Sequence, residues 1–402
     1  MLMQLFRRLL YPVSYSTVVL LKPIKLFAYD VPLEPLRRLI LAVTAPIDFG
    51  LIWLNIQDET MLLHQKVYGG NFIFGHGVMV TDHATTSADI VKPTFRGNNF
   101  MGVGIVASES AVFATNAPIL NQSPPVRAST RHYLDTHVFT PPMLSLDEAQ
   151  VRKRCAAVLD DWLAHPRMAD RNVLRSAVTR VFLKLLSDKT VTVEDSEAAT
   201  RMYIRRFLEF SLFGKYLPFV IDVLGSHKSI RKDAYFKLKA YDIDVMTIDI
   251  TLFAAMFSVG TVLMKAVEYI RRFHIPYADL SLQHKRNFVI EVLRLYPTVT
   301  SVHRIIEEPQ TVRVCHQDVR LTAGDEIVYP FVCSNRDPAA FPNPLRIDLN
   351  RPAEEYERVL SWSKGPHSCP AKEMSILVTV VMLDTLARRF PLHDLVIDNP
   401  TF

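Results

Sequence analysis

The stretch SWSKGPHSCPAKEMS, residues 361–375, places one cysteine between a Gly-Pro bend and an apolar run that is typical of a helix. A cysteine at a helix N-terminus faces unpaired backbone N–H groups and the positive end of the helix dipole, which favour the thiolate. A thiolate is a preferred ligand of soft metals. A nucleophile needs a nearby base, and His367 is a poor one for Cys369. The loop alone leaves three interpretations open: a structural thiol, a metal ligand and a nucleophile.

The composition indicates a folded globular protein. Of 402 residues, 49% are apolar and 22% are charged, which is ample for a large core. The net charge of +5 comes from 46 basic and 41 acidic residues scattered along the chain, so dense basic tracts typical of nucleic-acid binders are absent from the sequence. The chain has no clean linker, and we predict one domain over residues 1–402.

The cysteines lie far apart, with no C-x-x-C pair and no zinc-type spacing. This pattern argues against a disulfide framework and for a reducing, cytoplasmic compartment. The four cysteines are Cys155, Cys315, Cys333 and Cys369.

Residues 1–40 are predicted to form an N-terminal extension in which basic residues alternate with large apolar ones. Charged residues interrupt every apolar run before it reaches the about 20 residues that a spanning helix needs. Two interpretations remain. The favoured one is a segment packed over the body of the protein, and the other is peripheral contact with an anionic membrane surface.

Hydrophobic periodicity predicts a mainly α protein with a helix-rich lobe and a small β lobe. The segment GGNFIFGHGVMVTDH, residues 69–83, is typical of a β-hairpin. Helical patterns begin near Ser145, which has capping-box spacing to Glu148, and continue to residue 297. Short strands follow, and a last helix is predicted at about residues 371–390.

The segment EVLRLYP, residues 291–297, places Glu291 and Arg294 on one helical face, where their side chains can pair. Such a pair is common on protein surfaces. Here the helix is apolar, and a buried guanidinium needs a further partner. The proline-rich segment that follows supplies a candidate in Arg346.

Taken in order, four segments resemble the cytochrome P450 superfamily from its K helix through its cysteine loop: EVLRLYP, SVHR, SNRDPAAFPNPLRIDLNRP and WSKGPHSCPA. The family's pattern Phe-x-x-Gly-x-x-x-Cys-x-Gly is matched by Trp362, Gly365, Cys369 and Ala371, with Ala in place of the last Gly. The resemblance is strong over residues 285–390, weaker over 115–285 and faint before that. It implies a cytochrome P450-like fold that holds haem b and its iron.

The resemblance also assigns roles to single residues. It implies that Cys369 is the axial thiolate ligand of the haem iron, and that Glu291, Arg294 and Arg346 form the structural triad behind it. Backbone amides around the sulfur moderate the electron donation of the ligand. Pro370 cannot donate such a hydrogen bond, which predicts a lower iron potential.

Cationic residues in three segments match family positions that bind the haem propionates. Arg304 and His367 match two of them, and Arg131 matches a third in the segment NQSPPVRASTRHYLDTHVFTP. Arg127 stands where the family usually carries His, and a guanidinium suits a carboxylate at least as well.

Oxygen-activating members of the family carry an acid and an alcohol in the long helix over the haem, where the pair delivers protons. The matching segment is DITLFAAMFSVGTVLMKAVEYIRRF, residues 249–273. One register puts Gly260 and Thr261 in the place of the pair, and the other puts Met256 and Phe257 there. Neither register contains an acid. The catalytic candidates are Phe257, Ser258 and Thr261.

Substrate contacts are predicted by position alone, in mostly apolar segments that suit an apolar small molecule. The helix face formed by Phe253, Ala254, Phe257 and Ser258 is expected to line the distal side, as are residues 298–302. Residues 98–120 are expected to cover it, and residues 205–219 match the family's mobile lid.

The resemblance implies oxidation of a small apolar molecule, by O2-dependent monooxygenation in secondary metabolism. Electrons are expected from a separate ferredoxin-type partner, because the sequence has no flavin- or nicotinamide-binding fingerprint. The missing acid keeps other reactions open: peroxide-dependent oxygenation, hydroperoxide rearrangement or oxidative coupling. A non-catalytic haem-binding module is the second alternative.

Overall fold

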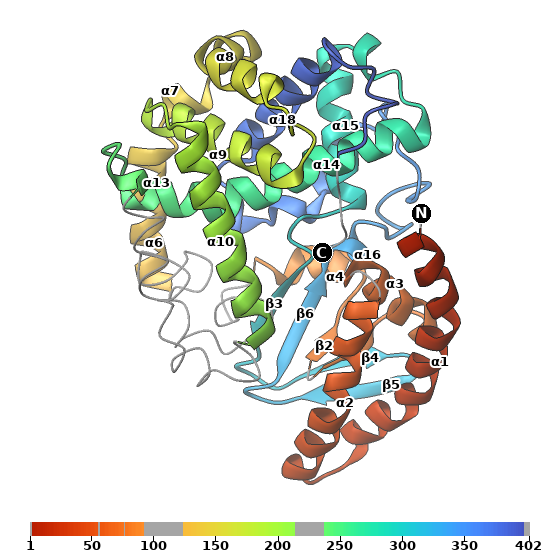
Figure 1. Cartoon of the computed structure of the whole chain (residues 1–402). Coiled ribbons are helices and arrows are strands. Elements are labelled where there is room, and N and C mark those ends of the chain that lie inside the picture. Colours follow the sequence, from red (N-terminus) through yellow and green to blue (C-terminus); the bar gives the residue numbers. More distant parts are fainter. Residues whose placement is uncertain (1, 55–56, 76, 92–123, 214–236, 398–402) are drawn as a thin grey trace.

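The computed structural model describes residues 2–54, 57–75, 77–91, 124–213 and 237–397 (Figure 1). The protein is 63% helical with a small sheet region, which confirms the predicted class. Figure 1 shows the helix-rich lobe above and the sheets below, with α1 and α2 on the outside of the sheet lobe. The prediction of one domain over the whole chain stays a prediction.

The helical lobe is built around a core drawn from most of its helices. Its helices are α6 (Pro124–Tyr133), α7 (Pro141–Leu144), α8 (Glu148–Ala164), α9 (Arg171–Ser187), α10 (Val193–Phe213), α13 (Val245–Ile250), α14 (Met256–Phe273), α15 (Leu282–Leu295) and α18 (Lys372–Ala387). The short turns between them are η3 (Leu134–Val138), η4 (Thr251–Ala255), η5 (Tyr277–Asp279), η6 (Leu360–Trp362) and η7 (Gly365–His367).

Helix α8 begins two residues later than its sequence pattern predicts. The side chain of Asp147 accepts a hydrogen bond from the backbone N–H of Gln150, and the Gln150 side chain accepts one from the Asp147 N–H. The capping box predicted at Ser145 and Glu148 is therefore wrong, because an equally good acceptor and partner occur two residues further along.

The β lobe joins segments from both ends of the chain. In its four-stranded sheet the order is β1-β2-β6-β3, and β4 pairs with β5 separately. The hairpin predicted at residues 69–83 is confirmed as antiparallel β1 and β2, and β2 runs parallel to β6. The strands are β1 (Phe72–Phe74), β2 (Gly77–Met79), β3 (Ser301–Ile305), β4 (Gln310–Val314), β5 (Gln317–Leu321) and β6 (Glu326–Pro330).

Six further helices belong to the β lobe or to the irregular segment that follows β6. Helix α1 packs against α2, α3, β1 and β5, so the N-terminal segment lies on the body of the protein, as the favoured interpretation predicted. The helices are α1 (Leu2–Asp30), α2 (Glu34–Leu54), α3 (Gln57–Tyr68), α4 (His83–Asp89), α16 (Phe331–Ser334) and α17 (Ala353–Arg358), of which α16 continues directly from β6.

A buried charged cluster fixes α1 and α2 to the β lobe. Lys25 on α1 pairs with Asp48 on α2, and both are at most 1% exposed. Asp48 also accepts a hydrogen bond from the backbone N–H of Gly75 at 2.6 Å. His64 of α3 lies 3.5 Å from the second Asp48 oxygen and contacts the Thr60 carbonyl at 2.9 Å through Nδ1. Breaking a buried pair of this kind leaves an uncompensated charge.

His64 is expected to make the protein sensitive to acid. Burial is the main cause that lowers the pKa of His64 from 6.5 to about 4, and the charge of Lys25 is a smaller cause in the same direction. Between these values the unfolded chain binds a proton that the folded chain does not, so the free energy of unfolding falls as the pH falls. The loss due to His64 reaches about 3 kcal/mol near pH 4, and the contribution of His64 is fully present above pH 6.5.

The measurement is the urea midpoint across this pH range for the wild type and His64→Phe. The variant is expected to lose the part of the pH dependence of stability that His64 causes. Phenylalanine suits the site, because Phe72 and Phe74 already surround the ring. His393→Phe is the control, since that side chain is 65% exposed. An unchanged slope in His64→Phe would contradict the prediction.

Candidate functional site

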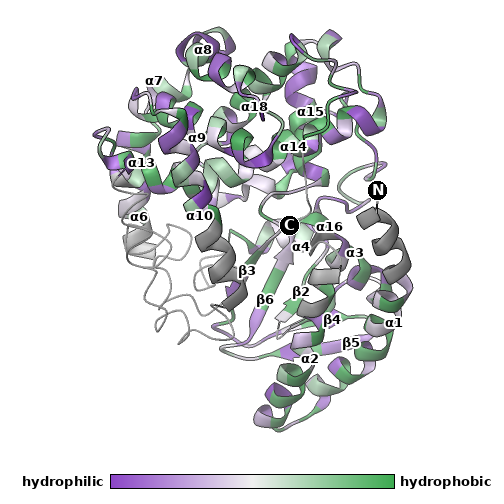
Figure 2. Cartoon of the chain, viewed as in Figure 1, coloured by the Kyte–Doolittle hydropathy of each residue, from purple (hydrophilic) through white to green (hydrophobic). Residues whose placement is uncertain are grey.

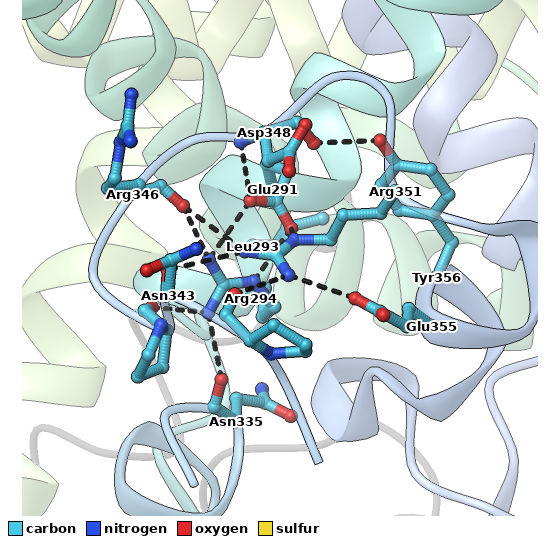
Figure 3. A network of polar contacts seen from close by, with 12 residues as sticks. Glu291, Leu293, Arg294, Asn335, Asn343, Arg346, Asp348, Arg351, Glu355 and Tyr356 are labelled. Atoms are coloured by element: carbon cyan, nitrogen blue, oxygen red, sulfur yellow. Dashed lines mark hydrogen bonds and ion pairs between the residues drawn. The ribbon is translucent and has the colours of Figure 1, made fainter. Parts of the chain in front are cut away.

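Glu291 and Arg294, whose side chains are fully buried, form the centre of a polar network (Figure 3). Arg294 Nε donates to Glu291 Oε1 at 2.6 Å and Nη2 donates to Oε2 at 2.9 Å. Its remaining N–H groups donate to the carbonyls of Asn335 at 3.0 Å, Pro344 at 2.6 Å and Arg346 at 2.9 Å. All five donors of the guanidinium are therefore satisfied, which a buried Arg requires.

The predicted third member of the triad, Arg346, is wrong. Arg351 supplies the second guanidinium: its Nε donates to Glu291 Oε1 at 3.0 Å, and its side chain is 2% exposed. Arg346 contributes its main-chain carbonyl, while its exposed side chain points away from the cluster in Figure 3. Glu355 on α17 accepts from Arg351 Nη1 at 2.9 Å. The i,i+4 spacing of Arg351 and Glu355 is the sequence feature that could have identified Arg351 as part of the network.

The network continues into the cysteine loop through Asn335, which sequence reasoning missed. The Asn335 side chain accepts from the Leu360 N–H at 2.9 Å and donates to Ser361 Oγ at 3.0 Å. Ser361 Oγ in turn donates to the Leu293 carbonyl of α15 at 2.7 Å. The helix that carries Glu291 and Arg294 thus holds the start of the loop in place.

The loop itself is closed around Cys369. The backbone N–H of Cys369 donates to the Trp362 carbonyl at 2.8 Å, and the Trp362 indole N–H donates to Ser375 Oγ on α18 at 3.2 Å. Gly365 has φ +62°, and a Cβ there would lie 2.8 Å from the Val91 side chain, so only glycine fits. Cys369 is consequently presented just before the N-terminus of α18.

Two effects act on the thiol of Cys369. Burial raises its pKa above the usual range, while the backbone N–H of Ala371 and the positive charge of Arg131 lower it. A soft cation next to the sulfur favours the thiolate, since metal ligation deprotonates a thiol. The expected loss of an amide donor at Pro370 is offset here by Ala371, one residue further on.

Cationic side chains meet around the loop from separate elements. Arg131 on α6 donates from Nη1 to the carbonyl of Ser368 at 2.8 Å and pairs with Asp135 at 2.9 Å. Arg304 on β3 is 2% exposed and reaches the Ile90 carbonyl at 3.5 Å, next to the residue that contacts Gly365.

The other two predicted cationic residues are placed less fully. His367 lies in η7, two residues before Cys369, and is partly exposed. Arg127 lies on α6, one turn before Arg131, and its side chain is outside the described residues. Three of the four predicted groups are thus placed at or near the loop by the structure.

Helices α13, η4 and α14 form one continuous helix from Val245 to Phe273, capped by the Asp244 side chain, which accepts from the Thr247 N–H at 3.1 Å. Its middle is buried except along one arc. Ala254 is exposed, and Ser258 and Thr261 are partly exposed at spacings of three and four, so they share that arc. Phe253 has its side chain outside the described residues.

Phe257 lies at the edge of this arc and turns toward neighbouring helices. Its ring is 5.3 Å from the Arg175 guanidinium carbon on α9 and 6.2 Å from the ring of Tyr203 on α10. The expectation that Phe257 lines the distal side is thus weakened by its contacts. Glu268 is the next carboxylate along the arc, two turns beyond Thr261, and it pairs with Lys265 at 2.8 Å.

Other predicted substrate contacts are only partly covered. Residues 298–301 are partly exposed between α15 and β3, and Val302 is buried. Residues 98–120 and 214–219 lie outside the described residues, as do the side chains of residues 205–213. The expected cover and lid therefore stay predictions.

The residues present fit a haem better than a metal held by protein side chains alone. Within the described ranges, no group of three or more His, Cys, Asp and Glu side chains could hold a metal ion. A cofactor that brings its own equatorial ligands and two carboxylates needs one protein ligand and nearby cations. Cys369 with Arg131 and Arg304 supplies both.

Comparison with known proteins gives the same answer. Residues 267–400 match the model of the cytochrome P450 family. Biflaviolin synthase of Streptomyces coelicolor is 33% identical over 84 residues, which is 20% of this chain and 20% of that protein. The chain thus spans about a fifth of the length of this curated relative.

Two solved structures show the extent of the likeness. A six-coordinated cytochrome P450 from Thermus thermophilus has a TM-score of 0.62 at 16% identity, covering 83% of this chain and 90% of its own. An epothilone D-bound cytochrome P450 has a TM-score of 0.61 at 16% identity, covering 84% and 91%.

The fold is that of solved cytochrome P450 structures, and the loop before α18 presents one cysteine at the head of this core helix. Residues 267–400, about a third of the chain, are similar to the cytochrome P450 superfamily, whose members bind haem with an iron centre.

Proposed function

We propose that this protein is a haem-thiolate oxidoreductase in which Cys369 is the axial ligand. The observation that carries the proposal is the placement of Cys369 in a loop that is fixed from behind by the buried Glu291–Arg294 pair and reached from the side by Arg131. Haem iron ligated by a thiolate supplies oxygen-transfer chemistry, because the sulfur donates electron density that favours O–O cleavage.

The cationic residues would hold the two propionates. Arg131 already donates to a carbonyl in the cysteine loop, so a propionate would accept from N–H groups at the same place. Arg304 is buried and reaches the Ile90 carbonyl, and its guanidinium could also donate to a propionate on that side. His367 and Arg127 complete the proposed set.

The substrate is proposed to be a small apolar molecule. Supporting this, the partly exposed arc of α14 carries Ala254, Ser258 and Thr261, which offer small surfaces and two hydroxyls. The names of two similar proteins support this proposal: one is called biflaviolin synthase, and another is a cytochrome P450 solved with epothilone D bound. A role in secondary metabolism follows as part of the proposal.

The proposed reaction is O2-dependent monooxygenation. One oxygen atom enters the substrate and the other leaves as water, with electrons from a separate ferredoxin-type donor and protons from solvent. Ser258 or Thr261 would hold a water molecule that passes the proton, since a hydroxyl both donates and accepts. We place this chemistry in a reducing, cytoplasmic compartment.

A second candidate is peroxide-dependent oxygenation, hydroperoxide rearrangement or oxidative coupling. It is favoured by the lack of a carboxylate on the described arc before Glu268, which is itself neutralised by Lys265. A peroxide already carries the oxygen atoms, electrons and protons that the acid would otherwise help to deliver.

The oxidant separates these candidates. Candidate ligands are first screened for a shift of the Soret band, and the ligand found is then incubated with the protein. We expect product only when O2 and an electron donor are both supplied. Product with hydrogen peroxide and no reductant would establish the second candidate instead. No spectral shift and no product under either regime would identify a non-catalytic haem-binding module.

A further inference from the structure

Helices α1 and α2 present large apolar side chains to the outside of the molecule. Eighteen large apolar side chains are exposed among the described ones, and twelve of them lie within residues 11–47. Figure 1 shows α1 and α2 along the outer side of the β lobe, and Figure 2 shows apolar residues over much of their length. Scattered exposed apolar residues are normal, but a contiguous face of this size marks an interaction site.

The exposed residues are ordered. Val13, Leu20 and Phe27 recur every seven residues on α1 and are 55%, 70% and 60% exposed, so they form one row. Alongside them, Leu39 and Val43 of α2 are 58% and 66% exposed. Leu33, in the turn between the helices, is 65% exposed and joins the two rows.

The polar groups of these two helices lie on the opposite side. Lys25 and Asp48 are buried in their mutual pair, and Arg37 is buried against Asp325 at 2.8 Å. Lys22, the other charged residue of α1 between Tyr11 and Phe27, donates inward to the Val67 carbonyl at 3.1 Å. Apart from the exposed Arg38–Glu34 ion pair at the start of α2, these charged side chains face inward while large apolar side chains face outward, the reverse of what a water-facing helix does.

We propose that the outer face of α1 and α2, here called the hairpin face and defined by Val13, Leu20, Phe27, Leu33, Leu39 and Val43, docks in the plane of a membrane surface that contains anionic lipids. This inference does not depend on the proposed function.

Several observations favour a lipid surface over a protein partner. The face carries mostly aliphatic and aromatic groups, and its exposed charges on α2 are paired with each other as Arg38 and Glu34. Tyr11 and Tyr15 stack at 6.5 Å near one end of α1, and amphipathic rings of this kind are typical of the membrane interface.

Charge and length fit the same arrangement. Of the six basic residues in 1–54, Lys22, Lys25 and Arg37 are held inward and Arg38 pairs with Glu34, which leaves Arg7 and Arg8, before the hairpin face in the sequence, as the cationic groups for anionic headgroups. In the part of the chain that the structure describes, no helix is both long and apolar enough to cross a bilayer, so the helices would lie in the interface plane.

The test is co-sedimentation of the full chain with vesicles made of equal parts phosphatidylcholine and phosphatidylglycerol. The double variant Leu20→Glu, Phe27→Glu places two charges in the hairpin face. Its partition into the vesicle pellet is expected to fall about tenfold or more, because each of these side chains contributes apolar area to the contact.

The matched control is the double variant Leu345→Glu, Phe273→Glu, whose residues are 68% and 42% exposed outside the hairpin face. It is expected to sediment like the wild type. Far-UV circular dichroism checks that both variants fold, and Val13→Ser, Val43→Ser is a milder pair if the first does not fold.

Three results would overturn the proposal. The wild type fails to sediment with the vesicles, or the Leu20 and Phe27 double variant sediments as well as the wild type. In the third, light scattering finds a wild-type dimer that the double variant converts to a monomer, without vesicle binding. That last result would assign the hairpin face to a second copy of this chain.

Discussion

Replacing Cys369 by His is expected to abolish the red-shifted Soret band of the reduced carbon monoxide complex, the band that gives the cytochrome P450 family its name. The band requires the thiolate as axial ligand, because electron donation from sulfur distinguishes this iron from one bound by imidazole. Haem itself is expected to remain bound. Imidazole is also an iron ligand, and Arg131 and Arg304 are unchanged.

The measurement is the difference spectrum after reduction and addition of carbon monoxide, with bound haem determined separately. Cys315→Ala is the matched control, since Cys315 is the other partly exposed cysteine and lies in the β lobe between β4 and β5. A band that survives in Cys369→His would remove Cys369 as the ligand. A wild type that binds no haem would remove the proposed function as a whole.

Replacing Arg351 by Met is expected to lower the free energy of unfolding by about 3–5 kcal/mol, the usual effect of removing one partner from a buried ion pair. Glu291 is completely buried and would lose the hydrogen bond from Arg351 Nε, while Glu355 and the Pro342 carbonyl would lose the donor at Nη1. Met keeps most of the volume, so the loss reports on the polar contacts rather than on a cavity.

Arg346→Met is the matched control, five residues earlier in the same segment. Its side chain is exposed and only its main-chain carbonyl enters the network, so the change is expected to stay within about 0.5 kcal/mol. Urea unfolding followed by circular dichroism measures both variants. A larger loss in Arg346→Met than in Arg351→Met would restore the triad predicted from the sequence.

These two arginines show where sequence reasoning ends. Arg346 and Arg351 stand in one irregular, proline-rich segment without periodicity, so nothing in the residue pattern tells which side chain turns inward. The path of the chain decides it: a bend at residues 343–346 directs the Arg346 carbonyl to Arg294, and Arg351 reaches Glu291 from the start of α17.

The long helix shows a similar division. The sequence lacks an acid in either register, and this is read directly from residues 249–273. Packing against α9 decides which residues of that helix remain exposed. On α9, Arg175 contacts Phe257, and a Cβ at Gly260 would lie 3.0 Å from the Arg175 side chain. Helical periodicity alone cannot choose between faces when apolar residues occur on all of them.

The sequence by itself determined the mainly α class, the β-hairpin, the pairing distance of Glu291 and Arg294 on one helical face and the loop that presents Cys369. Each of these is encoded within a few neighbouring residues, through periodicity, turn residues or i,i+3 spacing. Only the tertiary structure decided that Arg351 completes the network, that Asn335 links it to the cysteine loop, and that Lys25, Arg37 and Asp48 of α1 and α2 turn inward. Those features join residues far apart in the chain, and their energies depend on burial and on partners that local pattern does not specify.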